Sequence, residues 1–378
     1  MSEAYEKEIL LEDERGRGFA AVVKYGPYLF VSGSDGHRDL DTEEINPGLA
    51  WKEVEQSRNS YGRVKHRLEQ CGYSGDCAVR ILNYTSGQEW RLKRMALWPE
   101  YFGDFSQAVS WGSQARMSGI NMITSSVMAL VPEIERNVVV PQPERGRAAR
   151  VTDAGDFVYV IGVRGTGKNP LTGEEPVEEV PEAFAAQQRF CLDIIKNHLS
   201  KAGLGMDHIV SLDASIRNIN RLDEYHRLNQ SYFGGAAPFA GTVVGMPLGG
   251  RGEIEVGAIA VKDLKAKEVF WSDDLQTAAE CVKAGNLAFI SGCAGSRTSD
   301  KSGQYHQALR QLEHTLSGIG SDLDHVLKMD VYLRDIYGEV EFLEIAKGYF
   351  TGIAPAMSII GGDPSGGAEI EITAVAGN

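Results

Sequence analysis

The sequence has few cysteines and no long apolar run. None of its apolar stretches approaches the roughly 20 residues that a membrane-spanning helix needs, so we expect no membrane partner. The five cysteines are an odd number, and no two of them form a Cys-x-x-Cys pair. This usage favours reduced thiols over a disulfide framework or a zinc site. Cys293 directly follows a predicted strand, where a buried thiol is a better interpretation than a nucleophile because no histidine lies near it in sequence.

A concentrated basic segment is also missing. The chain has 38 Lys and Arg against 52 Asp and Glu, a net charge of −14, and this acidity opposes a phosphate backbone. The eight histidines show no metal-ligand spacing. Residues 165–168 (GTGK) lack the full phosphate-loop pattern. We therefore expect no nucleic-acid partner, no metal and no cofactor.

The first 17 residues contain no apolar core of the kind that a secretory signal has. They are rich in Glu, Asp, Lys and Arg and have no small-residue cleavage site. A cytoplasmic location is therefore the default expectation. The composition, 43% hydrophobic and 24% charged, is ordinary for a soluble globular protein.

What the chain does have is an internal repeat. An apolar strand ending in glycine occurs at 29–33 (LFVSG), 158–162 (VYVIG) and 288–292 (AFISG). Two further markers recur in the same order, a helix end with an aromatic pair (101–103, 232–234 and 349–352) and the tripeptide Glu-Ile-Glu (133–135, 253–255 and 369–371). Three ordered markers indicate triplication, with about 126 residues per copy, which is the size of one compact domain.

The middle copy gives the clearest order of elements. A strand at 156–161 ends at Gly162, and apolar residues at helical spacing predict a helix over 180–199. A strand at 209–216, a helix at about 222–232 and a closing pair of strands at 241–244 and 253–261 follow. With a short strand before Asp153, the order is β-β-α-β-α-β, an α+β class.

The first copy has diverged furthest from the other two. Its first helix is predicted from Val54, Tyr61, Val64 and Leu68, but its loop after Gly33 is unusually polar. We place the copies at 1–140, 141–266 and 267–378. Three fused domains predict a closed pseudo-threefold arrangement whose joints resemble those of a homotrimer.

This progression of motifs resembles the RidA/YjgF family of reactive-intermediate deaminases. The resemblance covers nearly all of the second and third copies and the first more weakly. It implies a chorismate-mutase-like barrel with sheets inside, helices outside and small-molecule clefts between copies. It also implies a monomeric pseudo-trimer or a low-order homo-oligomer.

By the same resemblance, the activity is hydrolysis of imines and enamines to ketones and ammonia. A glutamate at the first position of Glu-Ile-Glu positions the attacking water, a role that needs a carboxyl group within one water of the reacting atom. Carried over to this chain, that glutamate is Glu133, Glu253 or Glu369. The alternative is that alternation along the strand places both glutamates of each tripeptide in the polar lining of a central channel.

The family also uses an arginine in a Pro-Ala-Arg motif to grip a substrate carboxylate with two parallel hydrogen bonds. The chain departs from this pattern, because Ala240 and Met357 stand at that place in the second and third copies. In the first copy Arg116, within Ala-Arg-Met-Ser, is the candidate.

Other residues near the predicted clefts offer replacements. The loop after the first strand carries His37 and Arg38 in the first copy, Arg164 in the second and Arg297 in the third. The arginines are candidates for anion binding and His37 for acid or base chemistry, and solvated turn residues are the alternative.

An Arg-Gly-Arg motif precedes the first main strand at 15–17 and recurs at 145–147. Arg147 is therefore either a substrate ligand or part of an ion pair between copies.

Two classes of function remain open. The first is a hydrolase or deaminase acting on a small carboxylated or C=N-containing metabolite, including a chorismatase-like hydrolase, since fused folds of this kind occur there. The second is a binding or scaffold protein that kept the fold without the chemistry.

Overall fold

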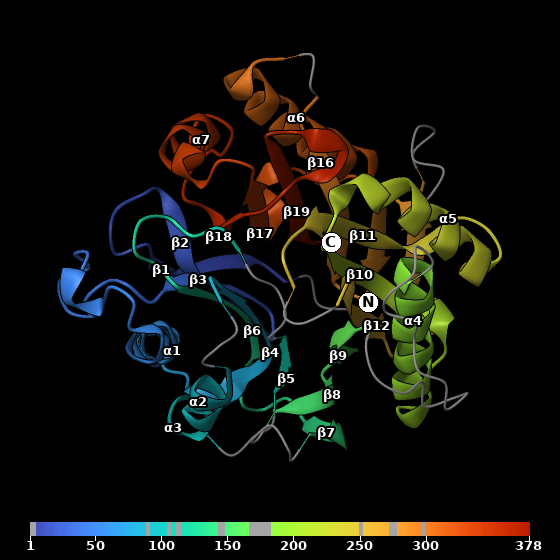
Figure 1. Cartoon of the computed structure of the whole chain (residues 1–378), viewed down its shortest axis with the longest axis horizontal. Coiled ribbons are helices and arrows are strands. Elements are labelled where there is room, and N and C mark those ends of the chain that lie inside the picture. Colours follow the sequence, from blue (N-terminus) through green and yellow to red (C-terminus); the bar gives the residue numbers. More distant parts are fainter. Residues whose placement is uncertain are drawn as a thin grey trace.

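The computed structural model describes residues 5–87, 91–103, 107–110, 115–142, 148–165, 183–248, 252–271, 278–296 and 299–378. Its strands form one large sheet, and helices cover it (Figure 1). The elements fall into three consecutive segments of the chain.

The first segment contains β1 (Lys7–Glu12), β2 (Phe19–Tyr25), β3 (Tyr28–Asp35), α1 (Glu53–Gln70), β4 (Ala78–Thr85), α2 (Arg91–Ala96), α3 (Trp98–Phe102), β5 (Ala108–Ser110) and β6 (Ile123–Leu130). The second contains β7 (Arg136–Pro141), β8 (Ala149–Ala154), β9 (Phe157–Arg164), α4 (Ala183–Lys201), β10 (Ile209–Ile216), α5 (Leu222–Phe233), β11 (Ala237–Gly245) and β12 (Ile254–Val261). The third contains β13 (Lys267–Phe270), β14 (Ala278–Ala279), β15 (Cys281–Ala284), β16 (Leu287–Ala294), α6 (Lys301–Gly318), β17 (Val326–Leu333), α7 (Glu339–Ala346), β18 (Ala354–Gly361) and β19 (Ile370–Gly377).

The predicted elements of the second segment are confirmed. β10 covers the predicted 209–216, and α5 covers 222–233 against a predicted 222–232. Gly234, in the left-handed conformation at φ 73°, ends α5 as a glycine C-cap. The predicted closing pair of strands is wrong in its pairing, because β10 lies between β11, which is parallel to it, and β12, which is antiparallel.

The same strand pairing recurs in the other two segments. β4 lies between β5 and β6, and β17 lies between β18 and β19, again with one parallel and one antiparallel neighbour. The sheet is therefore mixed, and each segment contributes the same local order of strands.

Short parallel pairings join each segment to the next. The opposed residues are Ala108 with Ala149, Ala237 with Ala278, and Ala354 with Phe19. We call these joints the 1–2, 2–3 and 3–1 seams. The last of them pairs β18 with β2, so the pairings run round in a barrel-like circuit (Figure 1).

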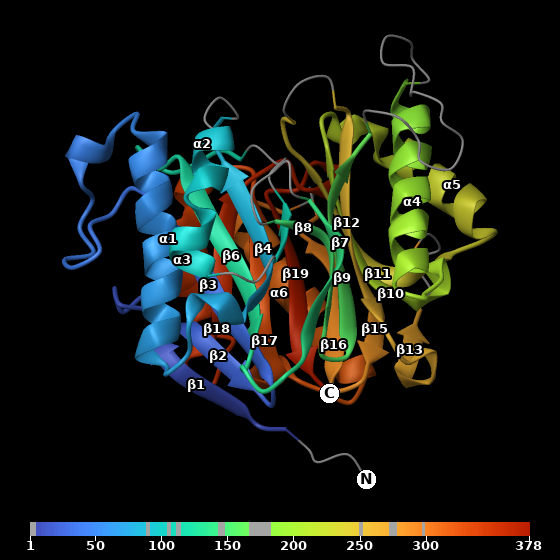
Figure 2. The same cartoon turned by 90° about the horizontal axis from the view of Figure 1, so that it is seen from below.

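The helices lie outside the strands, as predicted. α1 packs on β3 and β6, α4 on β9 and β12, and α6 on β16 and β19. Figure 2 shows α1 and α4 on opposite flanks of the strands. Within the described residues, no helix combines the length and the apolar character needed to cross a membrane.

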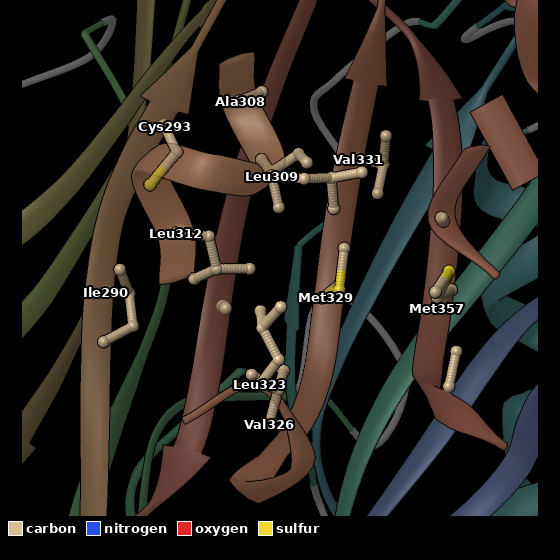
Figure 3. Close-up of a cluster of buried hydrophobic side chains, with 14 of the residues drawn as sticks. Ile290, Cys293, Ala308, Leu309, Leu312, Leu323, Val326, Met329, Val331 and Met357 are labelled. Atoms are coloured by element: carbon tan, nitrogen blue, oxygen red, sulfur yellow. The ribbon is translucent and has the colours of Figure 1, made fainter. Parts of the chain in front are cut away.

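Each segment has its own apolar core between helix and sheet. In the third segment, Leu309 and Leu312 of α6 face Ile290 and Met329 of the sheet (Figure 3). Cys293 lies in this core at 2% exposure, and burial raises the pKa of its thiol well above the usual range. The interpretation of Cys293 as a buried thiol is confirmed.

Candidate functional site

Three buried glutamines identify the positions that correspond between segments. The side-chain Oε1 of Gln56 on α1 accepts a hydrogen bond from the backbone N–H of Met122 at 2.7 Å. In the second segment, Oε1 of Gln187 accepts the equivalent hydrogen bond from the backbone N–H of Glu253 at 2.7 Å. In the third, Oε1 of Gln304 accepts it from the backbone N–H of Glu369 at 2.8 Å. Met122 therefore occupies the place that Glu253 and Glu369 fill elsewhere.

The prediction that Glu133 is the matching residue of the first segment is wrong. Met122 directly precedes β6, whereas Glu133 follows β6 at its other end, in an exposed turn before β7. The tripeptide at 133–135 repeats the letters of the motif but not its place before the last strand.

Glu253 and Glu369 are each held by an arginine of their own segment. Arg217 lies 3.1 Å from Glu253, and Arg334 lies 3.7 Å from Glu369. The backbone N–H of each arginine also donates to the carbonyl of that glutamate. In the first segment Ser86 makes the same backbone bond to Met122, so the first segment lacks both members of the ion pair.

The second glutamate of each tripeptide is the more buried one. Glu255 is 4% exposed; it accepts a hydrogen bond from Ser110 across the 1–2 seam at 2.6 Å and one from Arg164 at 3.0 Å. Glu371 is 2% exposed, and burial raises its pKa. The structure thus places Arg164 against a buried carboxylate at the end of β9.

Arg116 is not at the position of the motif arginine. The register places Ala108, Ala240 and Ala356 at the same level, so Met357 in the third segment corresponds to Gly241, rather than Ala240, in the second. Arg116 lies beyond β5, bridges backbone-to-backbone with Gly361 of β18, and pairs with Asp363 at 3.1 Å. It reaches the 3–1 seam from this loop.

The loop after β3 carries the next two candidates. His37 is 2% exposed, burial lowers its pKa, and its Nδ1 has no hydrogen-bond partner within the described residues. Arg38 donates to the carbonyl of Glu43 at 3.0 Å. Arg147 and Arg297 lie outside the described residues.

A cleft of about 450 Å³ opens at the 3–1 seam. Segment 115–122 and the loop before α1 form one wall, and residues 334–337 form the other. Its polar and aromatic side chains include Trp51, Ser86, Arg116, Asn121, Arg334 and Tyr337.

A small inner cavity of about 20 Å³ adjoins this cleft, and both are lined by Met117, Asn121 and Ile336. That volume is enough for one water molecule, which needs roughly 10–15 Å³. Two carboxyl groups line the inner cavity, Asp35 from β3 and Glu339 from the start of α7.

Their surroundings push the pKa values of these two carboxyl groups apart. Burial would raise the pKa of Asp35, but the charges of Arg15, His37 and Arg17 and a hydrogen bond from Thr124 at 2.8 Å lower it. For Glu339, burial and the nearby charge of Asp35 raise the pKa, although Arg17 lies 2.9 Å away. Such a pair suits one group to act as base and the other as acid.

Arg17 joins the two segments at this place. It donates to both carboxylate oxygens of Asp13 and, across the seam, to Glu339. Its guanidinium also lies 4.4 Å from the centre of the Phe19 ring. Of the two roles considered for the Arg-Gly-Arg motif, the first copy therefore uses the ion pair between segments.

Within the described residues, no group of three His, Cys, Asp or Glu side chains is placed to hold a metal ion. The inner cavity is lined instead by carboxyl groups and the guanidinium of Arg17, which are groups that can exchange protons or bind an anion.

Sequence reasoning missed Asp35, Glu339 and Arg334. Asp35 stands in the loop singled out for its polarity, and Arg334 recurs as Arg217 after the equivalent strand, a signal that could have been found. Glu339 has no such signal, because only the β18–β2 pairing brings it to the first segment.

The comparisons agree with this architecture. The family model described as Endoribonuclease L-PSP matches residues 277–377. A solved chorismatase structure matches 80% of this chain and 93% of its own at 14% identity and a TM-score of 0.50, a likeness of fold. No protein of curated function matches the chain.

Two bacterial YjgF-family structures match about one segment each. The Neisseria meningitidis protein is 25% identical over 30% of this chain and 94% of its own, with a TM-score of 0.28. The Mycobacterium tuberculosis protein is 26% identical over 30% of this chain and 99% of its own, with a TM-score of 0.28. With a RidA/chorismatase-like fold over most of the chain, the third segment belongs to the RidA/YjgF family.

Proposed function

We propose that this protein is a hydrolase that acts on a small carboxylated substrate with a C=N bond, at the cleft of the 3–1 seam. The observation that carries the proposal is the water-sized cavity beside Asp35 and Glu339, which shares lining residues with the cleft lined by Arg334. The family description names an endoribonuclease, but a net charge of −14 opposes RNA binding.

Asp35 is the proposed base and Glu339 the proposed acid. Asp35 takes a proton from the water as its oxygen bonds to the imine carbon, and Glu339 gives a proton to the nitrogen. The resulting carbinolamine then loses ammonia: the C–N bond breaks, Asp35 returns its proton to the leaving nitrogen, and Glu339 takes the hydroxyl proton as the C=O bond forms. Both groups are restored.

Arg334 is the proposed ligand of the substrate carboxylate. Its Nε donates to the carbonyl of Ala368 at 2.9 Å, and within the described residues its two Nη groups make no hydrogen bond. A guanidinium with both Nη groups available can bind a carboxylate through two hydrogen bonds. The carboxylate of Glu369 lies 3.7 Å from Nε of Arg334, so the positive charge of Arg334 is only partly balanced.

The 3–1 seam is favoured over the others because the first segment lacks a bulky ion pair there. Ser86 and Met122 line the cleft, whereas the corresponding positions of the third segment hold Arg334 and Glu369. Glu253 and Glu369, the candidates from the family motif, are then positioning groups for their arginines.

We also propose that the segments are fused copies around a pseudo-threefold axis, with limits near 1–140, 141–266 and 267–378. The recurring glutamine bonds of α1, α4 and α6 support this proposal. Because β7 pairs with β8, the first limit is better placed ahead of Arg136. One chain would then supply every seam as a monomeric pseudo-trimer.

The test follows ammonia release from imines that an amino-acid oxidase generates in place. Asp35→Asn and Glu339→Gln should each lower the rate by roughly 10²- to 10⁴-fold. Glu133→Gln is the matched control and should leave the rate unchanged. Activity should fall as pH rises through the raised pKa of Glu339, since the acid must be protonated.

A binding protein without turnover is the second candidate, because Met357 replaces the motif arginine. No acceleration by the wild-type protein, together with saturable binding of 2-oxo acids, would establish that candidate and exclude the hydrolase.

A further inference from the structure

We propose that the substrate carries an aromatic ring, which Trp51 and Tyr337 hold between them at the mouth of the 3–1 cleft. This inference rests on the proposed function for the placement of the substrate carboxylate. The two rings come from opposite walls, Trp51 from the first segment and Tyr337 from the third.

Trp51 is unusually exposed for a large apolar residue. It is 87% exposed, and its backbone has φ of 62°, a left-handed conformation that is rare for a large residue. Such backbone strain persists where the surrounding structure enforces it, and it gathers at ligand sites.

The chain around Trp51 enforces that conformation. The N–H of Lys52 donates to the carbonyl of Leu49 at 3.0 Å. Gln56, which is fully buried, donates to the same carbonyl at 2.9 Å and to that of Ile120 on the cleft wall at 2.8 Å. One side chain therefore fixes the tryptophan loop and the adjoining wall of the cleft.

Tyr337, on the other wall of the cleft, is also exposed and held by a local hydrogen bond. It is 74% exposed, and its backbone N–H donates to the carboxylate of Asp335 at 3.1 Å in a tight turn. Arg334 precedes this turn, so the proposed carboxylate ligand and the aromatic wall lie within four residues of each other.

The size of the cleft agrees with a ring-bearing ligand. Ligand pockets of about 300–1,000 Å³ hold molecules of drug size, and this cleft measures about 450 Å³. A three-carbon acid would leave most of that volume to water. An aromatic ring between two aromatic side chains gains affinity beyond its area alone.

The test measures binding of phenylpyruvate and pyruvate by calorimetry with the full-length protein. These stable 2-oxo acids are the expected products of an aromatic and a small imino acid. Phenylpyruvate should bind at least roughly tenfold more tightly than pyruvate. Trp51→Ala and Tyr337→Ala should each weaken phenylpyruvate binding by roughly 2- to 12-fold, the value of one aromatic pair, and leave pyruvate binding unchanged.

Trp271→Ala is the matched control, because Trp271 is 48% exposed and lies outside the residues that line the cleft. Equal affinity for the two acids, no binding of either, or an equal loss in the Trp271 variant would overturn the proposal. Imine hydrolysis without an aromatic preference would refute the ring site alone. Aromatic-selective binding without hydrolysis would refute the proposed activity alone.

Discussion

At the 3–1 seam, Asp13 and Glu339 contact the same arginine, yet their pKa values are shifted in opposite directions. Asp13 lies fully buried beneath Arg17, and Glu339 meets the same guanidinium from across the seam. Burial opposes ionisation of Asp13, but the hydrogen bond and charge of Arg17, with the charges of Arg15 and Arg67, lower its pKa to about 2. One guanidinium therefore stabilises an ionised carboxylate on one side, while its other partner keeps a raised pKa.

The low pKa of Asp13 makes a prediction for acid stability. A carboxyl group whose folded pKa is depressed stabilises the fold above its unfolded pKa, and that contribution is lost as pH falls through about 2. The shift from 3.8 corresponds to roughly 2 kcal/mol at neutral pH. Asp13→Asn should therefore lower the free energy of unfolding in urea at pH 7, and its difference from the wild type should shrink toward pH 2.

Asp41→Asn is the control for that experiment, because Asp41 is exposed in the loop after β3. A difference between the Asp13 variant and the wild type that stays constant over the whole pH range would contradict the assignment.

The Glu-Ile-Glu motif located the residue before the last strand correctly in two segments and incorrectly in the first. Glu253 and Glu369 directly precede the last strand of their segments, as the motif requires. Glu133 carries the same letters on the wrong side of β6. Asp35 and Glu339 are far apart in sequence, and no local pattern reports that they line one cavity.

Among elements, β9 and β16 show why a glycine recurs near the end of the strand. A Cβ on Gly162 would lie 2.2 Å from a carboxylate oxygen of Glu255, and one on Gly292 would lie 2.1 Å from the corresponding oxygen of Glu371. The predicted end of β9 is wrong: the strand was predicted at 156–161, but β9 spans Phe157–Arg164, so Gly162 lies inside it. The buried carboxylate that requires the glycine becomes visible only in the structure.

Gly162→Ala should therefore destabilise the fold by about 1–3 kcal/mol, the usual range for overpacking. Glu255 cannot move aside easily, because Ser110 and Arg164 hold it. Chemical denaturation of the single variant and of the Gly162→Ala/Glu255→Ala double variant measures this effect, and the double variant should recover the part due to the clash.

Gly257→Ala on the neighbouring β12 is the control. Its Cβ would have its nearest neighbour at 3.6 Å, an ordinary contact, so the change should stay below about 1 kcal/mol. Equal losses for the Gly162 and Gly257 variants would mean that the carboxylate contact has no effect.

The molecule as a whole is held together by polar contacts at its centre as well as by the seams. Arg80 of β4 and Asp213 of β10 pair across the first and second segments at 2.6 Å. Tyr84 and Tyr332 meet hydroxyl to hydroxyl at 3.0 Å, from the first and third. The predicted triplication implies such joints, but the residues that form them differ between segments and could not be inferred from the repeated motifs.

A double-mutant cycle on Arg80→Met and Asp213→Leu tests that central pair. Each single variant leaves a charge without its partner, so the two losses should add to more than the loss in the double variant. We expect a coupling of about 0.5–3 kcal/mol from thermal or urea unfolding. The exposed pair Arg58 and Glu100, at 2.8 Å, should give a smaller coupling, because solvent screens it.

A central coupling no larger than that of the exposed pair would mean that Arg80 and Asp213 do not tie the first two segments together.

Ser86 and Met122 have an evolutionary consequence. In an assembly of three identical chains, every mutation appears at three interfaces at once, and a change that helps one ligand pocket alters all of them. Here the gene encodes each wall separately, so selection can enlarge one pocket while Arg217 and Glu253 remain paired elsewhere.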